Sequence, residues 1–267
     1  MAFEAFQPCP GVWHIRDAMG VCMTLLMGGK HALLVDTGYG AEDVGAFVRT
    51  LTDLPLTVML THGHHDHVLG SRWFDEVYLL PADFPVYAVY TDTPWRKDVW
   101  AGAAQRGFTD EAGFLNAPLP RPLPLAAGDM DLGGLTARII PCPGHTPGSA
   151  VVYVPERRLL LTGDNWNPCT WLFFPEALSA QSYRENVRSL LALPFEEALC
   201  SHQFQVFDRG MPEGFWRGLT DAVLDAAVPS ETGRRVNRVA VQAALPGEQV
   251  FVFDREKYEK AKEGAYQ

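Results

Sequence analysis

The sequence predicts an α/β protein in which β-sheets are covered by helices. Two observations lead to this prediction. Short runs rich in β-branched and aromatic residues recur along the chain, and most of them end at Gly or Asp. Segments with apolar residues at helical spacing separate only some of these runs. The 267 residues can form a sizeable core, and we expect one domain over residues 1–267.

The first part of the chain predicts a β-meander followed by a helix and a buried strand. The strands are expected at residues 11–17, 21–29 and 31–38, because each of these runs is apolar and is closed by Gly or Asp. Residues 42–53 carry apolar side chains at helical spacing. The short apolar run 56–61 then predicts a buried strand.

Residues 81–125 interrupt this pattern. The stretch is mixed in character, contains Trp95, Trp100 and Phe108, and ends in the proline-rich run APLPRPLPL. We expect a helical insertion or lid here, followed by an extended connector.

Strand and helix signals return in the second half of the chain. Ser179 is a plausible N-cap for an amphipathic helix over residues 179–193, and a second helix is expected over 213–228. The expected strands lie at residues 135–144, 149–155, 158–164, 196–202, 238–245 and 249–254.

Composition excludes several classes of partner. The formal net charge is -10 and no basic run is present, which disfavours nucleic acid because phosphate binding needs clustered Lys and Arg. No stretch approaches the roughly 20 apolar residues of a membrane span, and the first residues lack a basic start. We therefore expect a soluble, cytoplasmic protein that does not bind membranes, with a small-molecule substrate and an undetermined oligomeric state. The 5 scattered cysteines contain no CxxC pair and are expected to be free thiols.

The segment THGHHDH, directly after the strand at 56–61, is the strongest functional signal in the chain. His62 and His64 are two residues apart, so an extended backbone would point both imidazoles to the same side. Asp66 and His67 follow after the chain turns and could face a second ion. His65 occupies the variable position of this HxHxDH motif and is expected to lie outside the ligand set.

Three further candidate ligands also follow predicted strands. His145 lies in the turn-rich run PCPGHTPGS, Asp164 ends LLLTGD, and His202 ends EEALCSH. Nitrogen and carboxylate oxygen donors without thiolates suit zinc, although iron and manganese accept the same set. The sequence therefore predicts a site for two divalent metal ions.

These motifs, in this order, resemble the metallo-β-lactamase superfamily. The resemblance extends over about residues 11–205 and implies a four-layer αβ/βα sandwich. It also implies that Asp36, in LLVDTG, supports the metal loop without ligating, and that Asp164 bridges the two metals. The remaining implied ligands are His62, His64 and His145 for one ion, and Asp66, His67 and His202 for the other.

The metal site predicts hydrolytic chemistry. Binding to metal lowers the pKa of water to about 7, so a hydroxide held between two ions would be the nucleophile. Asp66 or Asp164 could carry the proton as catalytic residues. We expect a small ester-like, lactone or thioester substrate.

The branch of the superfamily stays open. β-Lactamases of the family lack an acidic residue at the bridging position, and lactonases place a Tyr soon after it, where this chain has Asn165 and Trp166. Tyr183 is expected to be ordinary packing. Glyoxalase II enzymes carry a helical C-terminal domain with basic residues, whereas this tail offers only Arg234, Arg235 and Arg238. A mononuclear iron dioxygenase of the persulfide type and hydrolases of β-lactams or phosphodiesters are the alternatives.

Aromatic residues gather in two segments that the family motifs do not require, residues 81–108 and 166–174. An apolar wall with a few polar groups is typical of small-molecule pockets, but aromatic residues dominate protein cores as well. We expect a substrate wall formed by Trp95, Trp166, Trp171 and Phe173, with a buried loop as the alternative for the second segment.

Overall fold

The structure is a computed structural model that describes residues 3–235 and 239–264, except for the side chains of residues 234 and 235. Its first sheet is built mainly from the N-terminal part of the chain and has seven strands in sequence order. Pairing is antiparallel from β1 to β4 and parallel from β4 to β7. The strands are β1 (Glu4–Cys9), β2 (Val12–Arg16), β3 (Cys22–Met27), β4 (Ala32–Val35), β5 (Leu56–Met59), β6 (Tyr78–Leu79) and β7 (Leu123–Pro124). Parallel neighbours need a crossover, which between β4 and β5 is α1 (Val44–Leu51).

The second sheet comes from the middle of the chain and has the order β14-β13-β11-β10-β9-β8. Only β11 and β13 are parallel within it, and the chain between them contains α6 (Ala180–Ser189), whose N-cap is Ser179. The strands are β8 (Gly128–Asp131), β9 (Thr136–Pro141), β10 (Ala150–Val154), β11 (Leu159–Leu161), β13 (Glu197–Leu199) and β14 (Phe207–Asp208).

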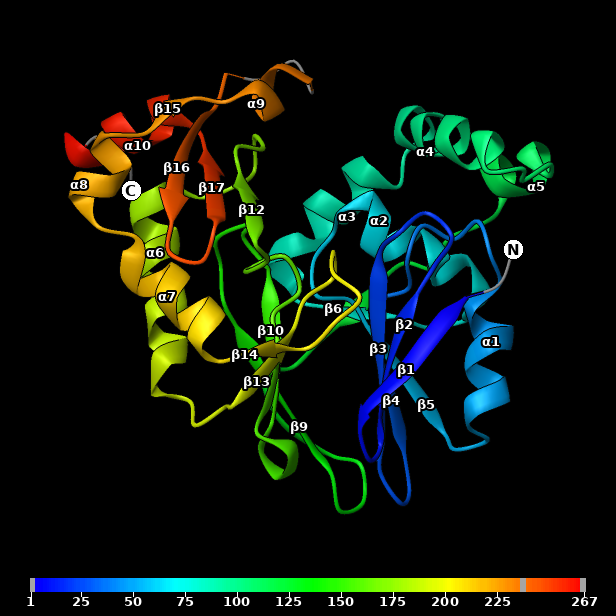
Figure 1. Cartoon of the computed structure of the whole chain (residues 1–267). Helices are drawn as coiled ribbons and strands as arrows, with labels where there is room; N and C mark the ends of the chain where they lie inside the picture. Colours follow the sequence, from blue (N-terminus) through cyan, green and yellow to red (C-terminus); the bar gives the residue numbers. More distant parts are fainter. Residues whose placement is uncertain (1–2, 236–238, 265–267) are drawn as a thin grey trace.

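Alternating side chains pack these two sheets face to face. On β4, Leu33 and Val35 join the core between the sheets, whereas Leu34 packs in the cluster that includes Val48 of α1. On β10, Val152 points into the core between the sheets. Each sheet thus has a helix-covered outer face, with α1 on one and α6 and α7 (Gly210–Gly218) on the other (Figure 1). The predicted four-layer αβ/βα sandwich is confirmed.

A third, smaller sheet was not predicted. Its order is β12-β17-β16-β15, and it packs against α6 and α7 through Phe251, which lies 5.2 Å from the ring of Tyr183 and 5.8 Å from that of Phe215. The strands are β12 (Cys169–Leu172), β15 (Val228–Pro229), β16 (Val241–Leu245) and β17 (Gln249–Phe253).

The C-terminal helices are shorter than the sequence indicates. The helix expected over 213–228 is two helices, α7 and α8 (Asp221–Asp225). The first ends at Gly218, and Thr220 caps the second by accepting a hydrogen bond from Val223 N. The other two are α9 (Glu231–Arg235) and α10 (Arg255–Lys262).

The segment 81–125 is largely helical. It contains α3 (Phe84–Tyr90), α4 (Thr93–Gln105) and α5 (Glu111–Asn116), and its proline-rich end supplies β7. Val99, Trp100 and Phe114 pack against Leu69 in a small core of their own, so Trp100 is a core residue. Short 3₁₀ helices occur at Leu69–Trp73, Pro81–Asp83, Pro155–Arg157 and Leu190–Ala192. Over the described ranges, none of the helices has the length and apolar character that crossing a membrane requires.

A buried histidine connects the first sheet to the loop after β13. His14 Nε2 donates to the backbone oxygen of Gln203, so Nδ1 of the neutral ring accepts from the Thr24 hydroxyl, each at 3.1 Å. Next to this contact, Cys22 N donates to Ser201 O over 2.7 Å. These bonds hold the backbone on both sides of His202. Burial lowers the pKa of His14 to about 4, although its bond to Gln203 opposes the shift.

We predict that His14 makes the protein less stable in mild acid. Because its pKa is lower in the folded protein than in the unfolded chain, the unfolded chain takes up the proton first, and stability present above about pH 6.5 is lost as the pH falls toward 4. Between about pH 7 and pH 5 this amounts to about 2 kcal/mol. Denaturant unfolding at both pH values should show a smaller difference in His14→Gln than in the wild type. Equal differences would contradict the prediction.

Candidate metal centre

The seven candidate ligands meet at one edge of the sandwich, where strands of both sheets end. His62 and His64 follow β5, and the short helix α2 (His65–Val68) carries Asp66 and His67. The other three come from the second sheet: His145 lies between β9 and β10, Asp164 follows β11, and His202 follows β13.

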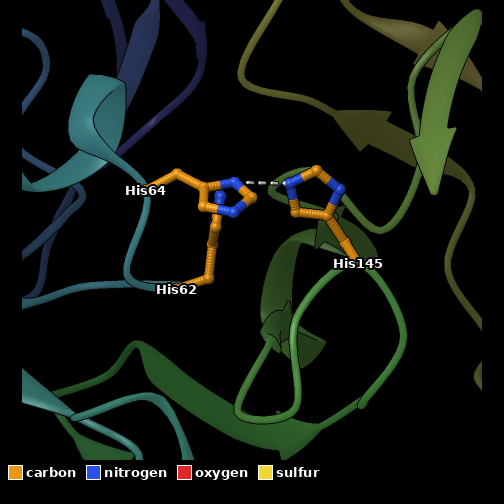
Figure 2. Close-up of side chains that lie close together, drawn as sticks. All are labelled: His62, His64 and His145. Atoms are coloured by element: carbon orange, nitrogen blue, oxygen red, sulfur yellow. Dashed lines mark hydrogen bonds between the residues drawn. The ribbon is translucent and has the colours of Figure 1, made fainter. Parts of the chain in front are cut away.

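His62, His64 and His145 form the first group, and their imidazoles point toward one another (Figure 2). One nitrogen from each lies within 4.8 Å of the others. His64 Nδ1 is 2.9 Å from His145 Nε2. All three side chains are buried.

Hydrogen bonds on the outer side of the first group set the tautomer of two of its rings. His145 Nδ1 donates to the Trp171 carbonyl over 2.8 Å. His64 Nε2 donates to the Glu176 carboxylate over 2.6 Å. The nitrogens that face each other, His64 Nδ1 and His145 Nε2, are therefore the unprotonated ones in neutral rings. Two lone pairs at this separation repel each other unless a cation lies between them.

The third ring of the group is oriented in the same way. Thr61 gives its one hydroxyl proton to Asp36, 2.8 Å from Oδ2, and so accepts from His62 Nδ1 at 3.0 Å. His62 Nε2 then carries a lone pair, is buried, and has no hydrogen-bond partner among the residues that the structure describes. Leaving such an atom unsatisfied costs about 1–3 kcal/mol. The first group therefore fits a metal ion that accepts three imidazole lone pairs.

Asp66, His67 and His202 form the second group. Asp66 Oδ2 lies 3.6 Å from His67 Nε2 and 3.7 Å from His202 Nε2. His67 Nδ1 donates to Asp36 Oδ2 over 2.9 Å, so its Nε2 is the free nitrogen, and that atom too lacks a partner within the described residues. The side chain of His202 is 35% exposed.

Asp164 lies between the two groups. Its Oδ2 is 2.9 Å from His202 Nε2 and 3.6 Å from His145 Nε2, and its Oδ1 is 3.5 Å from His67 Nε2. The carboxylate also forms a third potential ligand group with His62 and His67. This position fits a bridge between two ions.

The electrostatics of the two groups differ. Burial lowers the pKa of His62 well below its usual range and that of His145 to about 4, which disfavours a proton between the imidazoles of the first group. In the second group burial acts in the same direction on His67, but the carboxylates of Asp66 and Asp164 raise the pKa of that imidazole well above its ordinary value. The first group thus consists of imidazoles alone, whereas the second surrounds its imidazoles with carboxylates.

The imidazoles of the second group also depress the pKa of two nearby carboxyls, Asp66 of that group and Asp164 between the groups. Burial would raise the pKa of Asp66 and Asp164, but His67 and His202 hold both well below the ordinary range. Both carboxyls are therefore ionised near neutral pH.

Asp36 supports the ligands without belonging to a group, as expected. Its Oδ1 accepts from Thr61 N over 2.7 Å while Oδ2 accepts from His67 Nδ1. Asp36 has φ 65°, a left-handed conformation that costs a non-glycine residue free energy. Hydrogen bonds to both of its carboxylate oxygens hold Asp36 in this backbone conformation.

Asp83 is a supporting residue that sequence reasoning missed. This fully buried carboxylate accepts from Gly63 N at 2.7 Å, Gly148 N at 2.6 Å and the Thr146 hydroxyl at 2.8 Å. It joins the loop of His62 and His64 to the loop of His145. Asp83 ends a short 3₁₀ helix of the segment 81–125, where no motif marks it.

The expected aromatic wall is wrong for two of its four residues. Trp166 is 0% exposed, donates from Nε1 to Gln249 and packs 5.1 Å from the ring of Phe207. Phe173 is 2% exposed and packs with Ala240 and Val252 of the third sheet. Both turn toward the core because the segment after Asp164 enters the third sheet, which the sequence did not reveal.

The other two residues stay partly accessible, and different aromatics lie beside the imidazoles. Trp171 and Trp95 are half-buried. Trp95 packs 4.6 Å from the ring of Tyr90 and 5.2 Å from His65, which belongs to none of the ligand groups. The ring of Tyr90 is 4.4 Å, and that of Phe174 4.8 Å, from the ring of His64. Sequence reasoning did not single out Tyr90 or Glu176.

The structure describes Tyr183 but not the basic cluster of the tail. The Tyr183 hydroxyl is buried and donates to Asn165 O over 2.6 Å, as expected for a packing residue. The basic cluster of the tail falls outside the part of the chain that the structure describes. This applies to the side chains of Arg234 and Arg235 and to the whole of Arg238.

Comparison with known proteins places this geometry in a family. The model of the metallo-beta-lactamase superfamily matches residues 17–202. A probable metallo-hydrolase, YqgX of Bacillus subtilis, is 26% identical over 140 residues, 52% of this chain and 63% of that protein. A hydroxyacylglutathione hydrolase of Cereibacter sphaeroides is 31% identical over 151 residues, 55% of this chain and 48% of that enzyme. The chain thus matches about half to two thirds of the length of these relatives.

A solved structure agrees with the sequence matches. The metallo-beta-lactamase family protein TTHA1429 from Thermus thermophilus superposes with a TM-score of 0.59 at 22% identity, covering 82% of each chain. At this identity the likeness shows the fold alone, and the family model, which spans more than half of the sequence, shows the relationship. The chain belongs to the metallo-beta-lactamase superfamily.

Proposed function

We propose that the protein is a metal-dependent hydrolase with a dinuclear site that cleaves a small ester-like substrate, either a lactone or a thioester. The observation that supports this most is the pair of adjoining ligand groups with the Asp164 carboxylate between them. One group offers three imidazole lone pairs, and the other combines imidazoles with an ionised carboxylate.

The ligand assignment follows from these groups. His62, His64 and His145 would hold one ion, Asp66, His67 and His202 the other, and Asp164 would contact both. Zinc suits a set of nitrogen and oxygen donors, which iron and manganese also accept. Two such ions would activate a water molecule and polarise the carbonyl oxygen of the substrate.

The ionised carboxylates supply the proton acceptors. Asp66 and Asp164 both have depressed pKa values and lie between imidazoles that hold them in place. Either could take a proton from the attacking water and return it to the leaving group. His202 is half-buried while the other ligands are buried, so substrate would approach from its side of the site.

The surroundings support the ester-like class. Tyr90 and Phe174 present aromatic rings to His64, and apolar surfaces beside a few polar groups suit a small carbon-rich substrate. The Cereibacter relative is a hydroxyacylglutathione hydrolase, an enzyme named for an acyl thioester. The acidic residue at the bridging position separates the chain from the β-lactamases of the family. A cytoplasmic location is part of the proposal, supported by five cysteines that are all free thiols.

A substrate panel tests the proposed activity. We expect the zinc-loaded protein to hydrolyse lactones or thioesters and to lose this activity when a chelator removes the metal, because the ligands alone provide no nucleophile. Initial rates with a lactone, a thioester, a phosphodiester and a β-lactam are the measurement. Turnover of only the phosphodiester or the β-lactam would contradict the ester-like class. Oxygen consumption by a protein holding one iron would favour the dioxygenase alternative.

The ligand partition makes its own prediction. The wild type should bind about two zinc ions per chain, since two groups of three protein ligands share one bridging carboxylate. His202→Ala should bind about one, because His62, His64 and His145 do not depend on His202. Elemental analysis after dialysis measures both. His31→Ala is the matched control, as His31 bonds to Thr57 and belongs to none of the groups. Loss of both ions from folded His202→Ala would refute the partition.

Two tryptophans should behave in opposite ways. Trp95→Ala should lower kcat/KM on the best substrate by on the order of tenfold while the metal content stays unchanged, because Trp95 packs beside the site and is no ligand. Trp166→Ala should instead cost about 3–5 kcal/mol of folding stability, because Trp166 fills the core. Steady-state kinetics and denaturant unfolding of both variants, with Trp95→Phe as control, distinguish the roles. A destabilised Trp95→Ala with normal kinetics would assign Trp95 to packing.

A further inference from the structure

Glu176 lies in the loop between β12 and α6, outside the ligand groups and outside the motifs that carry the family resemblance. Its Oε1 accepts from His64 Nε2 over 2.6 Å and from the Tyr90 hydroxyl over 2.8 Å. The side chain is 16% exposed, against 5% for His64. A carboxylate so close to a ligand must affect how that ligand presents its other nitrogen.

We propose that Glu176 is a positioning residue of the first metal site. Its carboxylate holds His64 in the tautomer that presents Nδ1 to the ion, and through Tyr90 it connects this ligand to the helical insertion. The inference rests on the proposed function in one respect, namely that the first group holds a metal ion.

Glu176 differs from the hydrogen-bond acceptors of the other two imidazoles in the first group. His62 donates to a hydroxyl and His145 to a backbone carbonyl, both neutral acceptors, whereas His64 donates to an ionised carboxylate. A charge-assisted bond is roughly twice as strong as a neutral one, and a carboxylate on the far nitrogen makes an imidazole a better metal donor.

The position of Glu176 also balances charge. The first group consists of three neutral imidazoles, so an ion bound there keeps its full positive charge apart from what Asp164 offsets. Glu176 places a second carboxylate one imidazole away from that ion. Its contribution is electrostatic as well as geometric, and the amide of Gln would preserve only the geometric part.

Tyr90 extends the connection. It ends α3, the first α-helix of the segment 81–125, and its ring lies 4.4 Å from that of His64 and 4.6 Å from that of Trp95. One carboxylate therefore joins three parts of the chain: the loop of His64, the loop after β12, and the helical insertion. A shift of α3 would be transmitted to the orientation of a metal ligand.

Metal titration tests the proposal. Glu176→Ala and Glu176→Gln are freed of metal with a chelator and titrated with Co²⁺, whose absorption reports each binding step, and with Zn²⁺ against a chelating dye. We expect Glu176→Ala to weaken the affinity of one of the two binding steps by about 100-fold, and Glu176→Gln to weaken it by about tenfold. The affinity of the other step should stay unchanged. Glu185→Ala, which removes an exposed carboxylate from the neighbouring helix α6, is the control and should match the wild type.

The tautomer gives an independent readout. In the wild type, the proton on His64 Nε2 should give a slowly exchanging imidazole resonance in the NMR spectrum of the Zn²⁺-loaded protein. The signal should persist in Glu176→Gln, whose amide oxygen can still accept, and disappear in Glu176→Ala. A role in folding alone would lower thermal stability without selecting one metal or one resonance.

The outcomes separate this inference from the proposed function. A wild type that binds no metal would refute the metal-dependent function, and this inference with it. A wild type that binds two ions, together with a folded Glu176→Ala of unchanged affinity, would refute only the role of Glu176. Equal weakening of both steps would also refute it. If Glu176→Ala does not fold, Glu176→Gln decides, because unchanged affinity for the first ion in that variant overturns the proposal.

Discussion

Convergence of unprotonated nitrogens and carboxylates is the constraint on which the rest of this structure depends. One ring nitrogen of each imidazole in the first group donates a hydrogen bond to a partner outside the group. The other nitrogen of His62, His64 and His145 keeps a lone pair that points toward the centre of the group. Buried lone pairs and carboxylates of this kind are costly without a cation. The two sheets must therefore be packed so that strand ends from both meet at one edge, and the ligand loops must be held rigidly enough to offset the repulsion.

Three carboxylates that are outside the ligand groups provide this rigidity. Asp36 joins the β5 loop to His67, and Asp83 joins the His64 loop to the His145 loop across the sandwich. Glu176 adds the connection to the helical insertion. The site is thus supported from three sides by acceptors that satisfy backbone and ring N–H groups, and each support spans elements far apart in sequence.

The sequence predicted those features whose determinants are local. The HxHxDH segment is contiguous, and continuous apolar runs mark β4 and β10, so the ligand candidates and the strands could be found. The sandwich itself was implied only by the resemblance of the ordered motifs to the superfamily. Trp166 and Phe173 were placed wrongly because their burial depends on β17, which is about 80 residues away and pairs with β12. Asp83 and Glu176 carry no local signal, since an isolated acid in a loop gains its role only from partners brought to it by the fold.

The partner of His145 has a consequence for the order of events during biosynthesis. Its acceptor, the Trp171 carbonyl, belongs to β12, an edge strand paired in parallel with β17 near the C-terminal end of the described chain. Until residues 249–253 have left the ribosome, β12 has no neighbour to fix that carbonyl. The HxHxDH segment is translated early, but the Trp171 carbonyl that orients His145 is fixed only after residues 249–253 have been made. The orientation of a candidate ligand in the middle of the chain thus depends on a strand that is made well after it.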